Sequence, residues 1–232
     1  MKKRILMLVA LLATTVCVNA QDLESILKKH FDAVGQDKLV KVNSMKMKAT
    51  MNTQGLTMQA DIIVKKPNKT RTEIDMGTGQ KMIMSYDGTT AWTINPALGD
   101  QAQELPAGQA ASMISQADMD GALWNYKKKG HQVEYIGEEQ VDGIKYYKLK
   151  VLLKEQPNAE TVWYINANTY LIDFQNVKVN QYGTIVEARN IMAAYKNVEG
   201  VMLPSKFITE ANGVEQLSMT MSDIQLNVDV DD

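Results

Sequence analysis

An alternation of apolar and polar residues that begins at Ser44 limits most strongly what this chain can fold into. Residues 45–51 read Met-Lys-Met-Lys-Ala-Thr-Met, and residues 56–62 read Leu-Thr-Met-Gln-Ala-Asp-Ile, with a turn at Gly55 between them. Successive side chains of a β-strand point to opposite faces, so each segment has one apolar and one polar face. The pattern predicts antiparallel strands that bury one face of a sheet.

Similar patterns continue to the end of the chain, and together they predict about eleven strands. Glycine-containing turns such as Asp87-Gly88 separate several of them. Besides the two segments above, the predicted strands span residues 69–76, 81–86, 90–95, 132–136, 145–153, 161–165, 170–179, 184–195, 202–209 and 214–226.

Two other stretches predict helices. Residues 22–35 place apolar side chains at helical spacing between a capping Asp22 and Gly35. Residues 107–126 are rich in alanine and methionine and predict one or two short helices broken near Gly121. The predicted fold class is mainly β (α+β), with a sheet that curls round its apolar face and helices that cover its open side. The expected covering residues are Ala110, Met113, Ile114 and Met119.

The N-terminus has the three parts of a secretory signal peptide. A basic start over residues 2–4 precedes an apolar stretch over residues 5–18 and a small-residue cleavage motif that ends at Ala20. We expect removal of residues 1–20, which leaves a single exported domain over residues 21–232. A retained membrane anchor, or lipidation at Cys17, is the alternative.

Composition excludes several classes of function. The chain has 25 basic and 27 acidic residues, so it lacks the basic excess typical of proteins that bind nucleic acid. One cysteine and two histidines are too few for a disulfide framework or a Cys/His zinc site, and we expect His30 and His131 on the surface. No nucleophile-elbow, zincin, P-loop or dinucleotide-binding motif occurs. We therefore expect no catalytic residue, no metal site, no cofactor and no enzymatic activity.

Methionine is the unusual component of this sequence. The chain has fifteen, of which only Met1 and Met7 lie in the predicted signal peptide. Methionine is flexible and polarizable, so a methionine-rich surface adapts to apolar partners of varied shape, although an ordinary, loosely specified core has the same composition. The residues expected to line one apolar cavity are Met45, Met47, Met58, Ile62, Met82, Met84, Trp92, Ile94, Met113 and Trp163.

Two segments resemble a known family. Residues 64–68 read Val-Lys-Lys-Pro-Asn, and residues 86–96 read Tyr-Asp-Gly-Thr-Thr-Ala-Trp-Thr-Ile-Asn-Pro. Their sequence and spacing resemble the periplasmic lipoprotein carriers of Gram-negative bacteria, the LolA-type family. Residues 162–172 and 200–204 resemble strand pairs of the wider outer-membrane lipoprotein-sorting group.

The resemblance implies a half-barrel of about eleven antiparallel strands, closed by helices round a cavity that takes the acyl chains of lipoproteins. Exposure of such chains to water costs about 0.8 kcal/mol for each CH2 group, which a carrier avoids. The resemblance also implies a periplasmic location, with acylated lipoproteins, an inner-membrane transporter and an outer-membrane acceptor as partners. We expect a monomer that binds no nucleic acid.

Lys66 marks a departure from this family, which has an arginine before Pro-Asn that holds a helical lid closed through hydrogen bonds. Lysine lacks the planar fork of arginine. Pro67 has no N–H and takes the chain out of the sheet, so we expect Lys66 at the rim, with its ammonium near carbonyls at the end of a covering helix. Two other functions stay open: a carrier or sensor of another lipid or apolar ligand, and an interaction domain whose sheet is filled by its own side chains.

Overall fold

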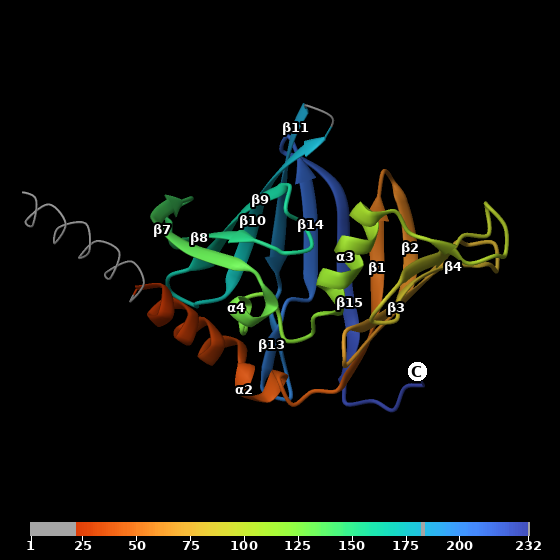
Figure 1. Cartoon of the computed structure of the whole chain (residues 1–232), viewed down its shortest axis with the longest axis horizontal. Helices are drawn as coiled ribbons and strands as arrows, with labels where there is room; N and C mark the ends of the chain where they lie inside the picture. The colour runs from red at the N-terminus through yellow and green to blue at the C-terminus, as the bar shows by residue number, and fades with distance from the viewer. Residues whose placement is uncertain (1–21, 182–183, 232) are drawn as a thin grey trace, which may run out of the picture.

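The computed structural model describes residues 22–181 and 184–231, most of which form one large antiparallel sheet (Figure 1). Thirteen strands lie in the order β6-β5-β4-β3-β2-β1-β15-β14-β11-β10-β9-β8-β7. The sheet is open, with β6 at one edge and β7 at the other. Its strands are β1 (Ser44–Thr53), β2 (Leu56–Lys65), β3 (Lys69–Asp75), β4 (Lys81–Tyr86), β5 (Ala91–Ile94), β6 (Gln103–Glu104), β7 (Gln132–Val141), β8 (Ile144–Leu152), β9 (Ala159–Asn166), β10 (Ile172–Gln181), β11 (Thr184–Ala193), β14 (Lys206–Ala211) and β15 (Val214–Leu226).

A separate hairpin of β12 (Lys196–Val198) and β13 (Val201–Leu203) brings the described strands to fifteen, more than the eleven expected. The predicted strand over residues 202–209 is two strands, because Pro204 lacks the N–H that a continuous ladder needs. The two-residue strand β6 is too short to give a periodic signal.

The helices are short and few. The first spans residues 22–34, and Gly35 joins it to α2 (Gln36–Leu39). The middle of the chain forms α3 (Ala107–Ala117), which lies within the predicted helical range 107–126, and α4 (Tyr126–Lys129), which begins only at the end of that range. Within the described residues, none of the helices combines the length and hydropathy needed to cross a membrane.

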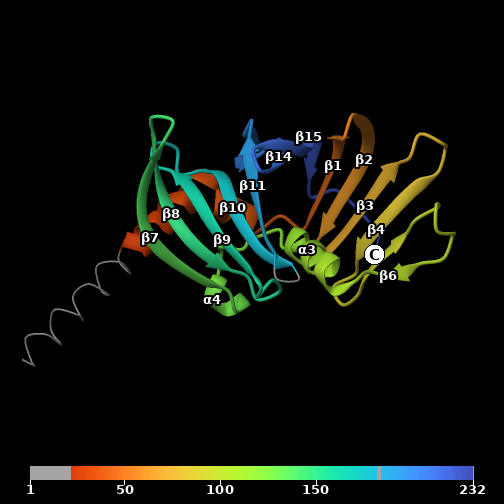
Figure 2. The ribbon, with the colours of Figure 1, turned by 90° about the horizontal axis from the view of Figure 1, so that it is seen from above.

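The N-terminal helix, α2 and α3 pack on the same side of the sheet, and Figure 2 shows α3 within the curve of the sheet. The N-terminal helix packs through Leu23, Ile26 and Leu27 on strands β8 to β10, where Leu149 and Ile165 are fully buried. Helix α3 packs at the other end of the sheet, on β3, β4 and β5. We call this side the helix face and the opposite side the outer face.

A close contact fixes the corner between the first two helices. Gly35 has a φ of +75°, and a Cβ built there would lie 2.2 Å from the carbonyl oxygen of Gly200 in the β12–β13 turn. Only glycine permits both this backbone conformation and this approach. The corner places α2 beside β13, against the core residues Leu39, Val42 and Val201.

Candidate functional site

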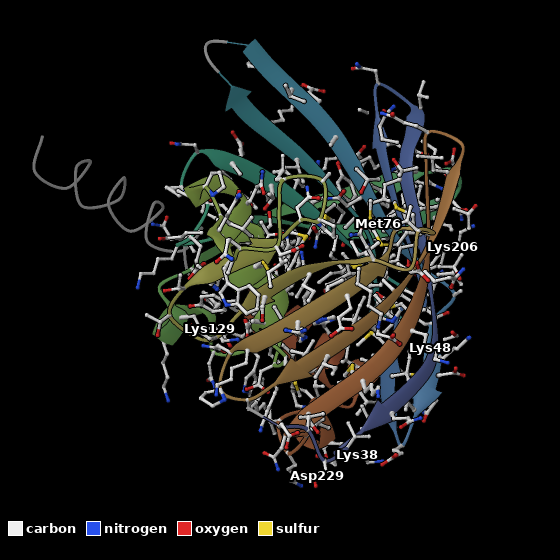
Figure 3. The ribbon with its side chains drawn as sticks, turned by 90° about the vertical axis from the view of Figure 1, so that its right-hand side faces the viewer. Lys38, Lys48, Met76, Lys129, Lys206 and Asp229 are labelled. Atoms are coloured by element: carbon white, nitrogen blue, oxygen red, sulfur yellow. The ribbon has the colours of Figure 1, made fainter. Side chains whose placement is uncertain are left out.

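The register of the sheet gathers methionines of β15, β1, β2 and β4 on the helix face, with β3 between the last two. Met51 of β1 lies opposite Met58 of β2 on one side and Met219 of β15 on the other. Farther along, Met82 of β4 lies opposite Ile74 of β3. We call this surface the methionine face. Its polar counterpart is the outer face, where Lys48 of β1 points away from the sheet (Figure 3).

Burial divides the methionine face into two parts. Near α2, Met45 and Met47 are only 7% exposed and belong to a core with Leu39 and Val201. Toward the hairpin turns, the side chains are only half-buried and contact the small residues Ala49 and Ala60. The half-buried residues are Met51, Met58, Ile62, Met82 and Met219. The chain therefore presents partly exposed, adaptable apolar groups beside a well-filled core.

Trp92 and Ile94 do not share this surface, so the prediction that they line it is wrong. Trp92 lies opposite Ser85, and Ile94 lies opposite Ile83, which places both on the outer face. The residues of β5 that face the helices are Ala91 and Thr93. Ala91 is 4% exposed under α3, because a small side chain there lets the helix approach the strand.

Helix α3 covers the β4–β5 end of the methionine face. Met113 and Ala117 are buried against Tyr86, Ala91 and Leu105. Ala110 and Ile114 pack at the edge of the same cluster, whereas Met119 packs in the core beside α2. The helix has no charged residue and no side-chain cap at its N-terminus, so apolar contacts hold it on the sheet.

Trp163 lies apart from the methionines. Its side chain is buried under the N-terminal helix with Leu27, Leu149 and Ile165. It faces the same side of the sheet as the methionine face but belongs to the core of the other half. The structure thus distributes the ten expected lining residues over the methionine face, helix α3 (Met113), the core under the N-terminal helix (Trp163) and the outer face (Trp92 and Ile94).

Lys66 lies at the turn between β2 and β3, where its ammonium contacts the end of a helix. The Lys66 Nζ donates to the carbonyl of Val40, the C-cap residue of α2, at 2.7 Å. It also lies 2.7 Å from Oδ1 of Asp120, in the segment that follows α3. Gln36 of α2 donates to the backbone carbonyl of Asp120 at 2.8 Å. These contacts join α2, the β2–β3 turn and the exit of α3.

A second lysine, which the sequence did not suggest, holds the same exit segment. Lys129 Nζ lies 2.7 and 2.6 Å from the two carboxylate oxygens of Asp118 and donates to the carbonyl of Gly121 at 2.8 Å. The sequence signal was a basic run at 127–129 beside two aspartates. The ion pair between Lys129 and Asp118 could not be predicted, because it depends on how α4 packs against the segment that follows α3.

Both histidines are buried, so their predicted surface position is wrong. His30 Nδ1 donates to the carbonyl of Tyr170 at 2.8 Å, and burial lowers the pKa of the imidazole below its ordinary value of 6.5. His131 accepts from the backbone N–H of Lys154. Helix and turn contexts indicated exposure, but both rings fill gaps between elements distant in sequence.

The described residues contain no group of three or more His, Cys, Asp and Glu side chains arranged to hold a metal ion. The candidate site consists of the methionine face and of the contacts that Lys66 and Lys129 make near the C-terminal end of α3.

Comparisons with known proteins agree with this architecture. No family model matches the sequence. An uncharacterized protein of Methanocaldococcus jannaschii is 25% identical over 179 residues, which cover 75% of this chain, and the chain spans about half (49%) of that relative.

Three solved structures are similar over most of their length. A LolA superfamily protein of Nitrosomonas europaea has a TM-score of 0.64 at 16% identity and covers 88% of this chain and 93% of its own. An outer membrane lipoprotein-sorting protein domain, as it is named, of Vibrio parahaemolyticus has a TM-score of 0.62 at 12% identity, with 90% and 94% covered. A DUF1329 family protein of Desulfovibrio piger has a TM-score of 0.60 at 15% identity, with 88% and 94% covered. At these identities the likeness concerns the fold, which is of the LolA type.

Proposed function

We propose that this chain, which has a LolA-type fold, is a cell-envelope carrier that binds acyl chains on its methionine face. The observation that carries the proposal is the set of half-buried methionines between the filled core near α2 and helix α3. Partly exposed apolar side chains gathered on one surface suit a site for an apolar ligand. Flexible thioether side chains suit a cargo that must be bound and released.

The specific cargo we propose is the acyl chains of lipoproteins, taken up in the periplasm and delivered toward the outer membrane. An inner-membrane transporter would load the carrier, and an outer-membrane acceptor would unload it. The name of the Vibrio parahaemolyticus domain supports this choice. We also propose that the chain binds its ligand without chemical change, because no catalytic motif was found in the sequence.

In this proposal α3 is the movable cover of the binding surface. Its apolar contacts with Tyr86 and Ala91 can be exchanged for contacts with a ligand, whereas ion pairs would hold it rigidly. The lysine contacts at Asp118 and Asp120 fix only the C-terminal end of the helix. Lys66 is then a closing contact of the lid, in place of the arginine of the LolA-type family.

A binding experiment tests the surface itself. Purified protein is titrated with a fluorescent acyl probe, and Met58→Glu is compared with Gln59→Glu. The two positions are neighbours on β2, but Met58 faces the helices and Gln59 faces outward. We expect Met58→Glu to weaken probe binding at least tenfold and Gln59→Glu to leave it unchanged. Equal affinities in both variants would remove the methionine face from the proposal.

Identification of the natural ligand separates lipoproteins from other cargo. The protein is expressed with its own N-terminus in a Gram-negative host, purified from the periplasm and extracted with organic solvent for mass spectrometry. Acylated peptides support the lipoprotein carrier, and free lipids support the second candidate, a carrier or sensor of another apolar ligand. If the extract contains no apolar ligand and the methionine face is filled by the protein's own side chains, the interaction domain is favoured.

A further inference from the structure

The outer face of strands β8 to β10 carries an aromatic cluster that the proposed carrier function does not use. The rings of Tyr164 and Phe174 stack with centroids 4.2 Å apart. Tyr146 meets both rings edge-on, at 6.0 and 5.2 Å. All three residues are under 10% exposed, although they face away from the helices. This aromatic cluster is a rigid apolar platform on the side opposite the methionine face.

Arg189 of β11 lies on this platform. Its guanidinium carbon is 3.8 Å from the centroid of the Phe174 ring, which is cation–π contact. Its Nε is buried and has no hydrogen-bond partner among the described residues. Glu210 lies directly opposite in the register and borders the same surface hollow as Arg189, but it is not among the ion-pair partners found in the described residues. Arg189 thus holds a fixed, planar set of donors that the described part of the chain does not satisfy.

Three lysines of β8 and β10 on this face differ from Arg189, because each has a carboxylate partner on a neighbouring strand. Their ion pairs are Lys148–Glu139 at 3.0 Å, Lys150–Glu160 at 3.1 Å and Lys178–Glu187 at 2.6 Å. Surface sheets commonly pair opposite charges in this way. Arg189 differs from these three lysines because it has no carboxylate partner among the described residues. This difference points to an anion supplied from outside the chain.

Two hollows meet at Arg189, which lines both. One, of about 540 Å³, has a mixed border that includes Asn176 and Asn212 and also the carboxylates of Glu160, Glu187 and Glu210, of which the first two pair with Lys150 and Lys178. The other, of about 420 Å³, has an apolar border that includes Ile144, Phe174 and Ile191. Both volumes fall within the range of small-molecule sites. Arg189 thus lies between a hollow of mixed polarity and an apolar hollow.

Asp173, which also borders the apolar hollow, is already occupied within the protein. Its Oδ2 accepts from the Tyr146 hydroxyl at 3.0 Å and from Asn166 Nδ2 at 2.8 Å. Burial, then the hydrogen bond to Asp173, raises the pKa of Tyr146 to about 12, so this hydroxyl remains a donor at neutral pH. The carboxylate therefore has partners of its own, and Arg189 is left as the unpaired group.

We propose that Arg189 and its two hollows form a second binding site, which takes a single-chain anionic amphiphile. The guanidinium binds a phosphate or carboxylate head group through its free N–H donors. The hydrocarbon chain occupies the apolar hollow against Ile144 and Ile191, and the polar remainder of the head group occupies the hollow beside Asn176. The site lies on the outer face, so its test is independent of the acyl-chain site on the methionine face.

NMR titration of the full chain tests the site, because it reports where each probe binds. The probes are hexyl phosphate, hexanoate, hexanol, inorganic phosphate and hexyltrimethylammonium. We expect saturable shifts at the Arg189 Nε–H and at the amides of β10 and β11 with hexyl phosphate and hexanoate, and weaker shifts with hexanol and inorganic phosphate. Shifts on the methionine face are scored separately and report on the proposed function.

Three variants decide the role of the guanidinium. Arg189→Gln should weaken hexyl phosphate binding at these amides at least tenfold, and Arg189→Lys should recover part of it. The matched control is Lys148→Gln, a cation of the same face that pairs with Glu139 and borders neither hollow. Unchanged affinity in Arg189→Gln, preference for hexyltrimethylammonium, or equal binding of inorganic phosphate and hexyl phosphate would each overturn the proposal. Retained amide spectra confirm that the variants fold.

Discussion

His30 connects the docking of the N-terminal helix to pH. Its ring is 7% exposed, and desolvation, opposed by the hydrogen bond to the carbonyl of Tyr170, lowers the pKa of the imidazole below 6.5. An unfolded chain therefore binds a proton at a pH where the folded chain does not. By linkage, stability is complete above pH 6.5 and falls as the pH decreases below it.

His30→Asn should flatten this dependence, since asparagine keeps an N–H near the position of Nδ1 but does not ionise. We expect the free energy of unfolding of the wild type to fall as the pH decreases below about 6.5, and that of the variant to fall less. Urea unfolding followed by tryptophan fluorescence measures both slopes. Parallel slopes would show that His30 does not set the acid response.

Lys66 and Asp120 form an ion pair that is partly shielded from water, with side chains 25% and 28% exposed. Lys66→Leu should leave the fold intact and lower the free energy of unfolding by about 1–2 kcal/mol, because one charged hydrogen bond and one ion pair are lost. The same variant should change the rate at which a bound fluorescent acyl probe is transferred to acceptor vesicles.

A double-mutant cycle with Asp120→Asn isolates the pair, and we expect a coupling of about 1 kcal/mol. If Lys66→Leu lowers stability but leaves the transfer rate unchanged, the pair is structural and has no part in lid opening.

Among the elements, the corner between the N-terminal helix and α2 depends most on glycine. Gly35→Ala meets two costs: a positive φ, worth about 1–2 kcal/mol, and a Cβ that would lie 2.2 Å from Gly200 O. Gly55, in the β1–β2 turn, has a similar φ of +81°, but a Cβ there meets nothing within 4 Å. Gly55→Ala should therefore cost about 1–2 kcal/mol and Gly35→Ala clearly more.

Chemical denaturation of the two variants measures this difference directly. Equal losses would mean that the β12–β13 turn moves away from Gly35 without cost, and that the corner does not position α2.

Most strands and helices could be predicted from the sequence. The face of the sheet that each side chain of a short strand occupies, and the distant residues that a side chain contacts, could not. The long alternation of β1 and β2 fixes which residues share a face, and the structure keeps that grouping for Met45, Met47 and Met58. Strand β5 has only four residues and no clear alternation. The packing of α3 on Ala91 decides which of its side chains face the helices. His30 and Lys129 find partners distant in sequence, and no local pattern encodes such contacts.

Across the whole molecule, stability should vary from the centre of the sheet to its edges. Strand β1 pairs along its length with β2 and β15, whereas β6 pairs through two residues and α3 packs on the sheet through apolar contacts, with few polar contacts besides. Amide hydrogen exchange should be slowest in β1, β2 and β15 and faster by orders of magnitude in α3 and β6.

A saturating acyl ligand should slow exchange in α3 and leave the central strands almost unchanged, because only the cover gains contacts. Uniform exchange across the chain, or protection of β7 in place of α3, would contradict this division.

The free edges of the sheet have a mechanical consequence. A closed barrel has a width set by its strand number and stagger, so it can widen only by breaking backbone hydrogen bonds. Here β6 and β7 end the ladder and are not paired with each other in the described chain. Small changes of twist, shared among thirteen strands, can bring these edges closer or farther apart while every ladder stays intact. The curvature of the open sheet can therefore adjust to the size of the ligand that lies against it, with no loss of backbone hydrogen bonds.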